Sequence, residues 1–220
     1  MQSAAKQVLD FILAAGGVIA LSPLLVIIGI LVKLDSRGPV LFQGERLARG
    51  GGTFKMYKFR TMVHAGNPTE PDRVASGTND SRITRLGAHL RRFKLDELPQ
   101  LINVIRGEMS LVGPRPEGVR YAKYYTGELQ RVLSVRPGIT GVAQLEYIEE
   151  SALLGAAEDY ETIYIERILP HKLALDLWYV DNWSLALDVR LILCTTVRVL
   201  AIAKTRAPAR ICQHKGGLHD

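Results

Sequence analysis

The stretch "KLDELPQLINVIRGEMSLVGPRPE" (residues 94–117) combines an acid pair, an apolar helical pattern and a proline-rich turn. Two acids, Asp96 and Glu97, stand side by side at its start. Apolar residues follow them at the helical spacing i, i+3, i+4 and i+7: Leu98, Leu101, Ile102 and Ile105. Gly107 ends the predicted helix, and the chain then stiffens into Gly-Pro-Arg-Pro. The stretch therefore predicts an acid pair at a helix start and, beyond the helix, a rigid turn that holds an arginine.

The acid pair has a structural explanation and a chemical one. Aspartate is a favoured helix N-cap, the helix dipole stabilises acids in a first turn, and Pro99 is tolerated there, so capping alone would account for both acids. The chemical explanation is a carboxylate whose pKa is lowered by the helix start and by nearby arginines. Such a carboxylate stays ionised at neutral pH, and it can bind Mg²⁺ or attack a phosphorus atom.

Basic residues near the pair favour the chemical explanation. "YKFR" at the end of a predicted strand supplies Lys58 and Arg60, and Arg91 lies about one and a half helical turns before the acids. Arg115 stands between two prolines, so its backbone is nearly fixed and its guanidinium forms a pre-set fork for phosphate. Each cation alone would be a solvated surface residue. Together with the acid pair they predict a phosphate site.

Residues 11–32, "FILAAGGVIALSPLLVIIGILV", predict a membrane anchor. No charge interrupts them, and their number is close to the roughly 20 residues that cross a bilayer. The segment ends in "KLDSRGP", which is not a signal-peptide cleavage site, so we expect it to be retained.

The break at Ser22-Pro23 leaves two topologies open. Proline removes a backbone donor and bends a helix, and Ser22 can hydrogen-bond the freed backbone. Cations flank the segment on both sides, with Lys6 before it and Lys33 and Arg37 after it. A kinked spanning helix and a re-entrant hairpin with both ends in the cytoplasm account for these features about equally well.

Composition and periodicity predict a small, mostly helical α/β protein. The chain has 220 residues, which favours one domain. Its net charge of +6 suits nucleic acid, an anionic membrane or a phosphorylated substrate, but low aromatic content and the lack of an RNA-binding signature argue against nucleic acid. Short strands are expected at 40–43 and 53–59, and helices at 83–93, 117–133, 146–166, 173–180 and 185–204.

Several motifs resemble the bacterial sugar transferase family, in its small form. They are "MYKFRTM" (residues 56–62), "SRITRLGAHLRRFKLDELPQLINVIRGEMSLVGPRPE" (81–117), "VRPGITGVAQ" (135–144) and "LDLWYVDNWSLALDVRLIL" (175–193). The resemblance covers nearly the whole chain from residue 33 to about 200. The family consists of monotopic phosphoglycosyl transferases that start glycan assembly on a polyprenyl phosphate.

The resemblance implies roles for the site residues. Asp96 matches the family's nucleophile, and Glu97 matches the second acid of its dyad. Mg²⁺ is the implied cofactor, held through Asp96. Lys58, Arg91 and Arg115 match cationic positions near the phosphate site. The acidic segment 145–166 departs from many members, so the sugar specificity of other members cannot be carried over.

The resemblance also resolves the topology and divides the chain. It implies a re-entrant membrane helix over residues 1–36 that turns back at Ser22-Pro23. A membrane-anchored monotopic catalytic domain with short strands follows over 37–204, and a basic tail over 205–220. The expected location is the cytoplasmic face of the bacterial inner membrane, in contact with membrane lipid.

The predicted reaction transfers a sugar 1-phosphate from a UDP-sugar to undecaprenyl phosphate. A covalent phosphosugar-aspartyl intermediate forms, UMP is released, and the product begins a bacterial glycan. An alternative is a non-catalytic, membrane-tethered adaptor that binds anionic lipid, which would leave the acid pair and Gly-Pro-Arg-Pro unexplained. A phosphohydrolase that uses Asp96 is a third interpretation.

Overall fold

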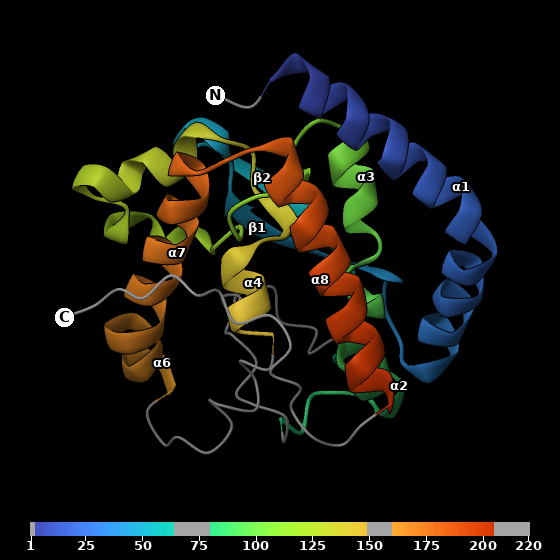
Figure 1. The fold of residues 1–220 in the computed structure, drawn as a ribbon. Helices are drawn as coiled ribbons and strands as arrows, with labels where there is room; N and C mark the ends of the chain where they lie inside the picture. The colour runs from blue at the N-terminus through green and yellow to red at the C-terminus, as the bar shows by residue number, and fades with distance from the viewer. Residues whose placement is uncertain (1–2, 64–79, 149–159, 205–220) are drawn as a thin grey trace.

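A long N-terminal helix curves along one side of the computed structural model, which describes residues 3–63, 80–148 and 160–204 (Figure 1). In chain order the elements are α1 (Ala4–Asp35), β1 (Leu41–Leu47), η1 (Arg49–Gly51), β2 (Thr53–Phe59), α2 (Arg85–Arg92), η2 (Leu95–Glu97), α3 (Gln100–Ile105), β3 (Ser110–Val112), η3 (Val119–Tyr124), η4 (Gly127–Ser134), β4 (Gly138–Thr140), α4 (Val142–Glu146), α6 (Tyr160–Ile163), the π-helical turn η5 (Tyr164–Ile168), α7 (Leu169–Asp181) and α8 (Leu185–Lys204). The predicted basic tail, 205–220, lies outside the described residues.

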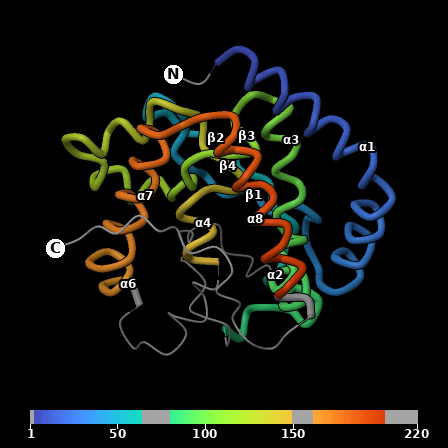
Figure 2. The backbone as a smooth tube through the Cα atoms, viewed as in Figure 1, coloured from blue at the N-terminus to red at the C-terminus, as the bar shows by residue number. Residues whose placement is uncertain are grey.

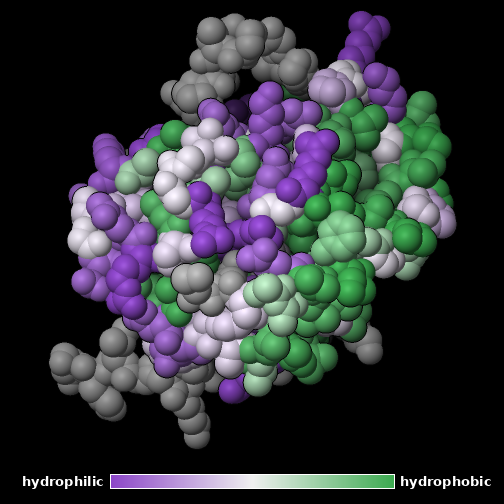
Figure 3. Space-filling view, turned by 90° about the horizontal axis from the view of Figure 1, so that it is seen from above, coloured by the Kyte–Doolittle hydropathy of each residue, from purple (hydrophilic) through white to green (hydrophobic). Residues whose placement is uncertain are grey.

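Helix α1 is bent and largely exposed, although it is apolar. Pro23 lies inside it, and the Ser22 hydroxyl donates to the Ile19 carbonyl at 2.8 Å, which is the carbonyl that Pro23 leaves without a partner. The tube in Figure 2 changes direction part-way along the helix. By length and composition α1 is able to cross a membrane. Hydrophobic surface gathers over it on one side of the molecule, and hydrophilic surface covers the other side (Figure 3).

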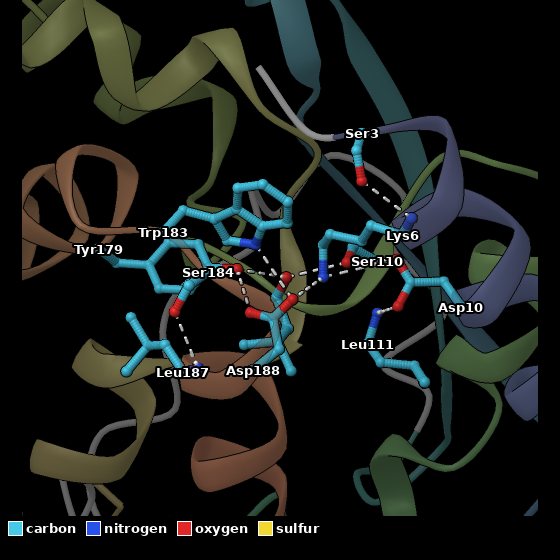
Figure 4. A network of polar contacts seen from close by, with 11 residues as sticks. Ser3, Lys6, Asp10, Ser110, Leu111, Tyr179, Trp183, Ser184, Leu187 and Asp188 are labelled. Atoms are coloured by element: carbon cyan, nitrogen blue, oxygen red, sulfur yellow. Dashed lines mark hydrogen bonds and ion pairs between the residues drawn. The ribbon is translucent and has the colours of Figure 1, made fainter.

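The N-terminal end of α1 is held by a buried polar cluster, which we call the clamp: Lys6, Asp10, Ser110, Tyr179 and Asp188 (Figure 4). Lys6 Nζ lies 2.6 Å from Asp188 Oδ2 and 3.7 Å from Asp10 Oδ2. Ser110 donates to Asp10 at 2.7 Å, and Tyr179 donates to Asp188 at 2.7 Å. The clamp therefore joins α1 to β3, α7 and α8.

The C-terminal end of α1 is held by Arg60, which follows β2. Its guanidinium donates to the carbonyls of Val32 at 3.1 Å, Ser36 at 2.6 Å, and Pro39. The carbonyls at a helix end have no partner within the helix, so a buried guanidinium satisfies them. Both ends of α1 are thus fixed to the same body of helices and strands.

The hairpin of β1 and β2 pairs antiparallel from Leu41↔Phe59 to Leu47↔Thr53. Asn103 of α3 is fully buried and attaches this hairpin to the helix. Its Oδ1 accepts from the Tyr57 amide at 3.0 Å, and its Nδ2 donates to the Lys55 carbonyl at 2.8 Å. The Asn103 side chain therefore bonds to the edge of β2 that has no neighbouring strand among the described residues. These contacts place Lys58, the residue after Tyr57, beside η2.

A second pair of strands, β3 and β4, run parallel to each other and pack against α7 and α8. The strands approach closely at Gly138, where an added Cβ would lie 2.1 Å from the Gly113 amide nitrogen, so only glycine fits. Val112, Leu145, Tyr179 and Leu191 form the core between this pair and the two C-terminal helices.

The structure confirms the mostly helical α/β class and corrects several local predictions. The first strand is longer than predicted, and β3 and β4 were not predicted. The segment predicted as one helix over 117–133 forms two 3₁₀ helices. The sequence predicted Leu98, Leu101, Ile102 and Ile105 as the apolar face of the helix that follows the acid pair. The buried residues of α3 are instead Gln100, Asn103 and Val104, because the helix binds β2 through Asn103. Of the helix predicted over 146–166, residues 149–159 lie outside the described residues.

The clamp gives a stability prediction. Asp188→Ala should lower the free energy of unfolding by about 3–5 kcal/mol, because it leaves the buried Lys6 ammonium without its closest carboxylate. Asp181→Ala is the matched control, since its ion pair with Arg131 is exposed and should contribute little. Thermal unfolding of the two variants in detergent makes the comparison, and equal shifts in Tm would contradict a stabilising role for the clamp.

Candidate active site

The acid pair lies in the 3₁₀ turn η2, between α2 and α3, and it does not cap a helix. Neither η2 nor α3 has a side-chain cap hydrogen bond. Asp96 is buried, and its Oδ1 is shielded from solvent without a hydrogen-bond partner among the described residues. The absence of a cap hydrogen bond rules out the capping explanation. Burying a carboxylate oxygen without a partner costs free energy, which indicates that this oxygen has a function other than capping.

Glu97 is held by two of the predicted cations. Lys58 Nζ donates to its Oε1 at 2.8 Å, and Arg115 Nη2 lies 3.7 Å from the same oxygen. Burial alone would raise the pKa of Glu97, but the charges of Lys58, Arg115 and Lys94 outweigh it and hold the pKa far below its usual range. Glu97 therefore remains ionised and keeps the cations in place.

Asp96 behaves differently from the sequence-based expectation. We expected nearby cations to lower its pKa, but the pKa is raised. The largest cause is burial, and the negative charge of Glu97 adds to it, against the opposing charges of Lys58, Lys94 and Arg91. The ionised Asp96 is thus poorly solvated, which favours bonding to an electrophile or a cation.

Arg91 reaches the site because α2 packs tightly against the end of β2. An added Cβ at Gly87 would lie 2.2 Å from the Thr61 carbonyl oxygen, so glycine is required for this approach. Arg91 Nε then donates to Thr61 Oγ1 at 2.8 Å. Burial lowers the pKa of Arg91, and the nearby negative charge of Asp96 opposes that shift.

Arg115 is positioned by buried groups on α7 and just before it. Its backbone amide donates to Asp176 Oδ2 at 3.3 Å. Glu117, two residues after Arg115, is also held in place. Lys172 Nζ lies 2.8 Å from its Oε1, and the Tyr164 hydroxyl donates to its Oε2 at 2.8 Å. These contacts fix the Gly-Pro-Arg-Pro turn at Arg115 and directly after it.

Arg60 is not brought to the acid pair. The sequence predicted it as a phosphate-binding residue, but both of its Nη atoms donate to carbonyls around the end of α1. Four of the predicted site residues besides Asp96 do meet: Glu97, Lys58, Arg91 and Arg115. Ser22 and Pro23 are far from the acid pair in the sequence. They lie inside α1 and form the bend of that helix.

The site fits a hard divalent cation only with help from a ligand. No group of three or more His, Cys, Asp or Glu side chains comes together in the described part of the chain. Mg²⁺, however, is commonly bound by one or two carboxylates plus substrate phosphates. The unpartnered Oδ1 of Asp96 is the oxygen suited to that purpose, whereas Glu97 is already engaged by cations.

Sequence reasoning missed the residues that support the site. Lys94, one residue before η2, carries a further positive charge near Glu97, and Asp176 and Lys172 position the arginine turn. The spacing of Lys172 and Asp176 was the available signal, because two charged residues four apart share one face of an otherwise apolar helix.

A buried acid among four cations is an arrangement suited to binding a phosphate group. Comparison with known proteins agrees with this class: the bacterial sugar transferase family matches residues 1–202. The chain belongs to that family.

Relatives extend the comparison. The chain is 40% identical over 200 residues to a UDP-glucose:undecaprenyl-phosphate glucose-1-phosphate transferase of Xanthomonas campestris pv. campestris, covering 89% of this chain and 39% of the relative. It is 36% identical over 198 residues to a UDP-N-acetylgalactosamine-undecaprenyl-phosphate N-acetylgalactosaminephosphotransferase of Aeromonas hydrophila, covering 89% and 43%. It is 37% identical to exopolysaccharide production protein PSS of Rhizobium leguminosarum bv. phaseoli, covering 90% and 96%. The chain thus spans less than half the length of the first two relatives and nearly all of the third.

The arginine turn gives a pH-dependent prediction. Burial raises the pKa of Asp176 well above its usual range, so the contribution of this residue to stability falls as pH rises above about 4, where an unfolded aspartate ionises. Asp176→Asn removes that ionisation and keeps an oxygen that can accept from the Arg115 amide. Its melting temperature relative to wild type should rise between pH 5 and pH 8.

Asp176→Ala is the matched variant, because it removes the acceptor as well. It should melt below Asp176→Asn at every pH. An Asp176→Asn protein that loses stability relative to wild type as pH rises would show that the ionised carboxylate is the favoured form.

Proposed function

We propose that this protein transfers a sugar 1-phosphate from a UDP-sugar to undecaprenyl phosphate and releases UMP. The observation that carries the proposal is the buried Oδ1 of Asp96, which has no hydrogen-bond partner in the described part of the chain and is surrounded by the charges of Lys58, Lys94, Arg91 and Arg115. The relatives named for UDP-sugar and undecaprenyl-phosphate substrates support the choice of donor and acceptor.

The proposed reaction has two displacements at one phosphorus atom. An Asp96 carboxylate oxygen attacks the sugar-side phosphorus of the UDP-sugar, an O–P bond forms, and the bond to UMP breaks. The phosphate oxygen of the lipid then attacks the same phosphorus and breaks its bond to Asp96. Asp96 is regenerated as a carboxylate, and the sugar phosphate ends on the lipid.

The surrounding groups supply electrostatic stabilisation. Lys58 and Arg115, both held by Glu97, would face the phosphate oxygens as charge develops on them. Because the pKa of Glu97 is so low, we assign it to positioning these cations rather than to proton transfer. Mg²⁺ bound through Asp96 and the substrate would neutralise phosphate charge when present.

We further propose that α1 is re-entrant and that the site faces the cytoplasm at the inner membrane. A straight helix of 32 residues would rise about 48 Å, enough to cross the roughly 30 Å hydrocarbon core. Crossing would carry Lys6 away from Asp188, because Arg60 holds the opposite end of α1 to the same domain. The clamp, the bend at Pro23 and the exposed apolar surface together favour a helix that enters and leaves on one side.

Release of UMP tests the proposed reaction. Purified protein with Mg²⁺ and undecaprenyl phosphate should release UMP from one or more members of a panel that includes UDP-glucose and UDP-N-acetylgalactosamine. Asp96→Asn should reduce turnover by at least about 1,000-fold, because an amide is a poor nucleophile, while the protein still folds. A substantial residual rate would exclude covalent catalysis by Asp96. Product released as free sugar phosphate without lipid would instead identify a phosphohydrolase.

Cysteine labelling tests the topology. In a chain with both native cysteines replaced by serine, Ser3→Cys should resist a membrane-impermeant reagent in intact cells, and it should be labelled after the cells are opened. Lys123→Cys, exposed on the catalytic domain, is the control and should behave in the same way. Adding Ser22→Leu, Pro23→Leu and Asp188→Asn should release the N-terminus to the outside. Labelling of Ser3→Cys alone in intact cells would overturn the hairpin.

A further inference from the structure

Lys94 has a backbone conformation that its side chain does not favour. Its φ of 55° and ψ of 19° are left-handed, and it is the one non-glycine residue with positive φ among the described residues. Side chains with a Cβ are disfavoured there, and glycine or asparagine is the usual choice. Residues kept in such a conformation cluster at functional sites.

The turn itself does not require a lysine. The Lys94 amide donates to the Arg91 carbonyl at 3.1 Å, and its carbonyl accepts from the Glu97 amide at 3.3 Å. Both contacts use backbone atoms alone, so they join α2 to η2 whatever the side chain is. Glycine would make the same contacts with less steric conflict.

The Lys94 side chain brings a positive charge that acts on both acids through space but is not bound to either of them. It is half-buried, and its charge interacts with Glu97, Arg115, Lys58 and Asp96. Its ammonium makes no hydrogen bond or ion pair with another residue of the described ranges, whereas Glu97 is occupied by Lys58 and Arg115. The ammonium is therefore available to an incoming anion.

The charge balance indicates which anion fits. Four cations, Lys58, Lys94, Arg91 and Arg115, lie around two acids. The excess of two positive charges matches the two negative charges that the diphosphate of a nucleotide sugar carries. Lysine suits such a ligand, because its three donors rotate freely and act as a point charge.

We propose that the Lys94 ammonium binds the diphosphate of the nucleotide sugar, and that the left-handed turn aims it beside the acid pair. This inference rests on the proposed function, because it assigns a substrate contact within the same site. It makes Lys94 a substrate-binding residue in addition to its place in the turn.

Three variants separate the charge from the backbone. Lys94→Gly and Lys94→Asn suit the left-handed conformation and remove the charge, whereas Lys94→Arg keeps the charge. Lys55→Asn, at an exposed lysine of β2, is the matched control. The measurements are the melting temperature, the KM for the UDP-sugar in UMP release, and the Kd for UDP by calorimetry, with UMP as a monophosphate comparison.

We expect Lys94→Gly and Lys94→Asn to melt at or above the wild-type temperature while their KM for the UDP-sugar and Kd for UDP rise about 10- to 100-fold, the range for a hydrogen bond to a charged group. Lys94→Arg should recover part of both, and Lys55→Asn should match wild type. Binding of UMP should change less than binding of UDP. Wild-type KM and Kd in the glycine and asparagine variants would overturn the inference and leave Lys94 as a turn residue.

The UDP measurement also keeps this inference separate from the proposed reaction. If wild-type protein bound UDP through Lys94 but released no UMP in the presence of lipid acceptor, the proposed transfer would fail and the diphosphate contact would stand. If wild-type protein released UMP and the Lys94 variants bound UDP normally, the transfer would stand and the contact would fail.

Discussion

Asp96 sets the main electrostatic constraint of the site, because its carboxylate is kept out of water and one of its oxygens has no hydrogen-bond partner among the described residues. Burying such an oxygen costs free energy, and the surrounding cations offset part of that cost through their charge. Glu97 takes the opposite role, because its strong contacts with Lys58 and Arg115 satisfy it. Two adjacent acids thus acquire different properties from their surroundings: the pKa of Asp96 is raised and that of Glu97 is lowered.

The remainder of the fold serves to hold those surroundings. Asn103 fixes β2, and so Lys58, to α3. The turn that holds Arg115 is fixed to α7 by Asp176 and by the ion pair of Glu117 with Lys172. The clamp and Arg60 attach the two ends of α1 to the same body. Helix α1 and the residues around the acid pair are therefore parts of one packed unit, which is how a protein that acts on a lipid phosphate would keep its site at the membrane surface.

The sequence predicted the elements whose signal is local. The apolar segment, its Ser-Pro break, the acid pair and the arginine between prolines were each readable from neighbouring residues. The sequence did not reveal that Lys6 and Asp188 form a buried pair, since they are 182 residues apart and each looks like a surface charge. It misplaced Arg60 for the same reason, because a helix end that needs a donor is visible only once α1 is packed beside β2. The sequence also predicted the wrong direction for the pKa shift of Asp96, because a count of nearby charges omits desolvation.

The covalent role of Asp96 is the centre of this account, and intact-protein mass spectrometry tests it most directly. The protein is incubated with its UDP-sugar and Mg²⁺ but without lipid acceptor, then quenched and weighed. We expect one equivalent of UMP and a mass increase of one sugar phosphate, mapped to Asp96 and absent from Asp96→Asn. No adduct and no UMP until lipid is added, or an adduct on a different residue, would contradict it.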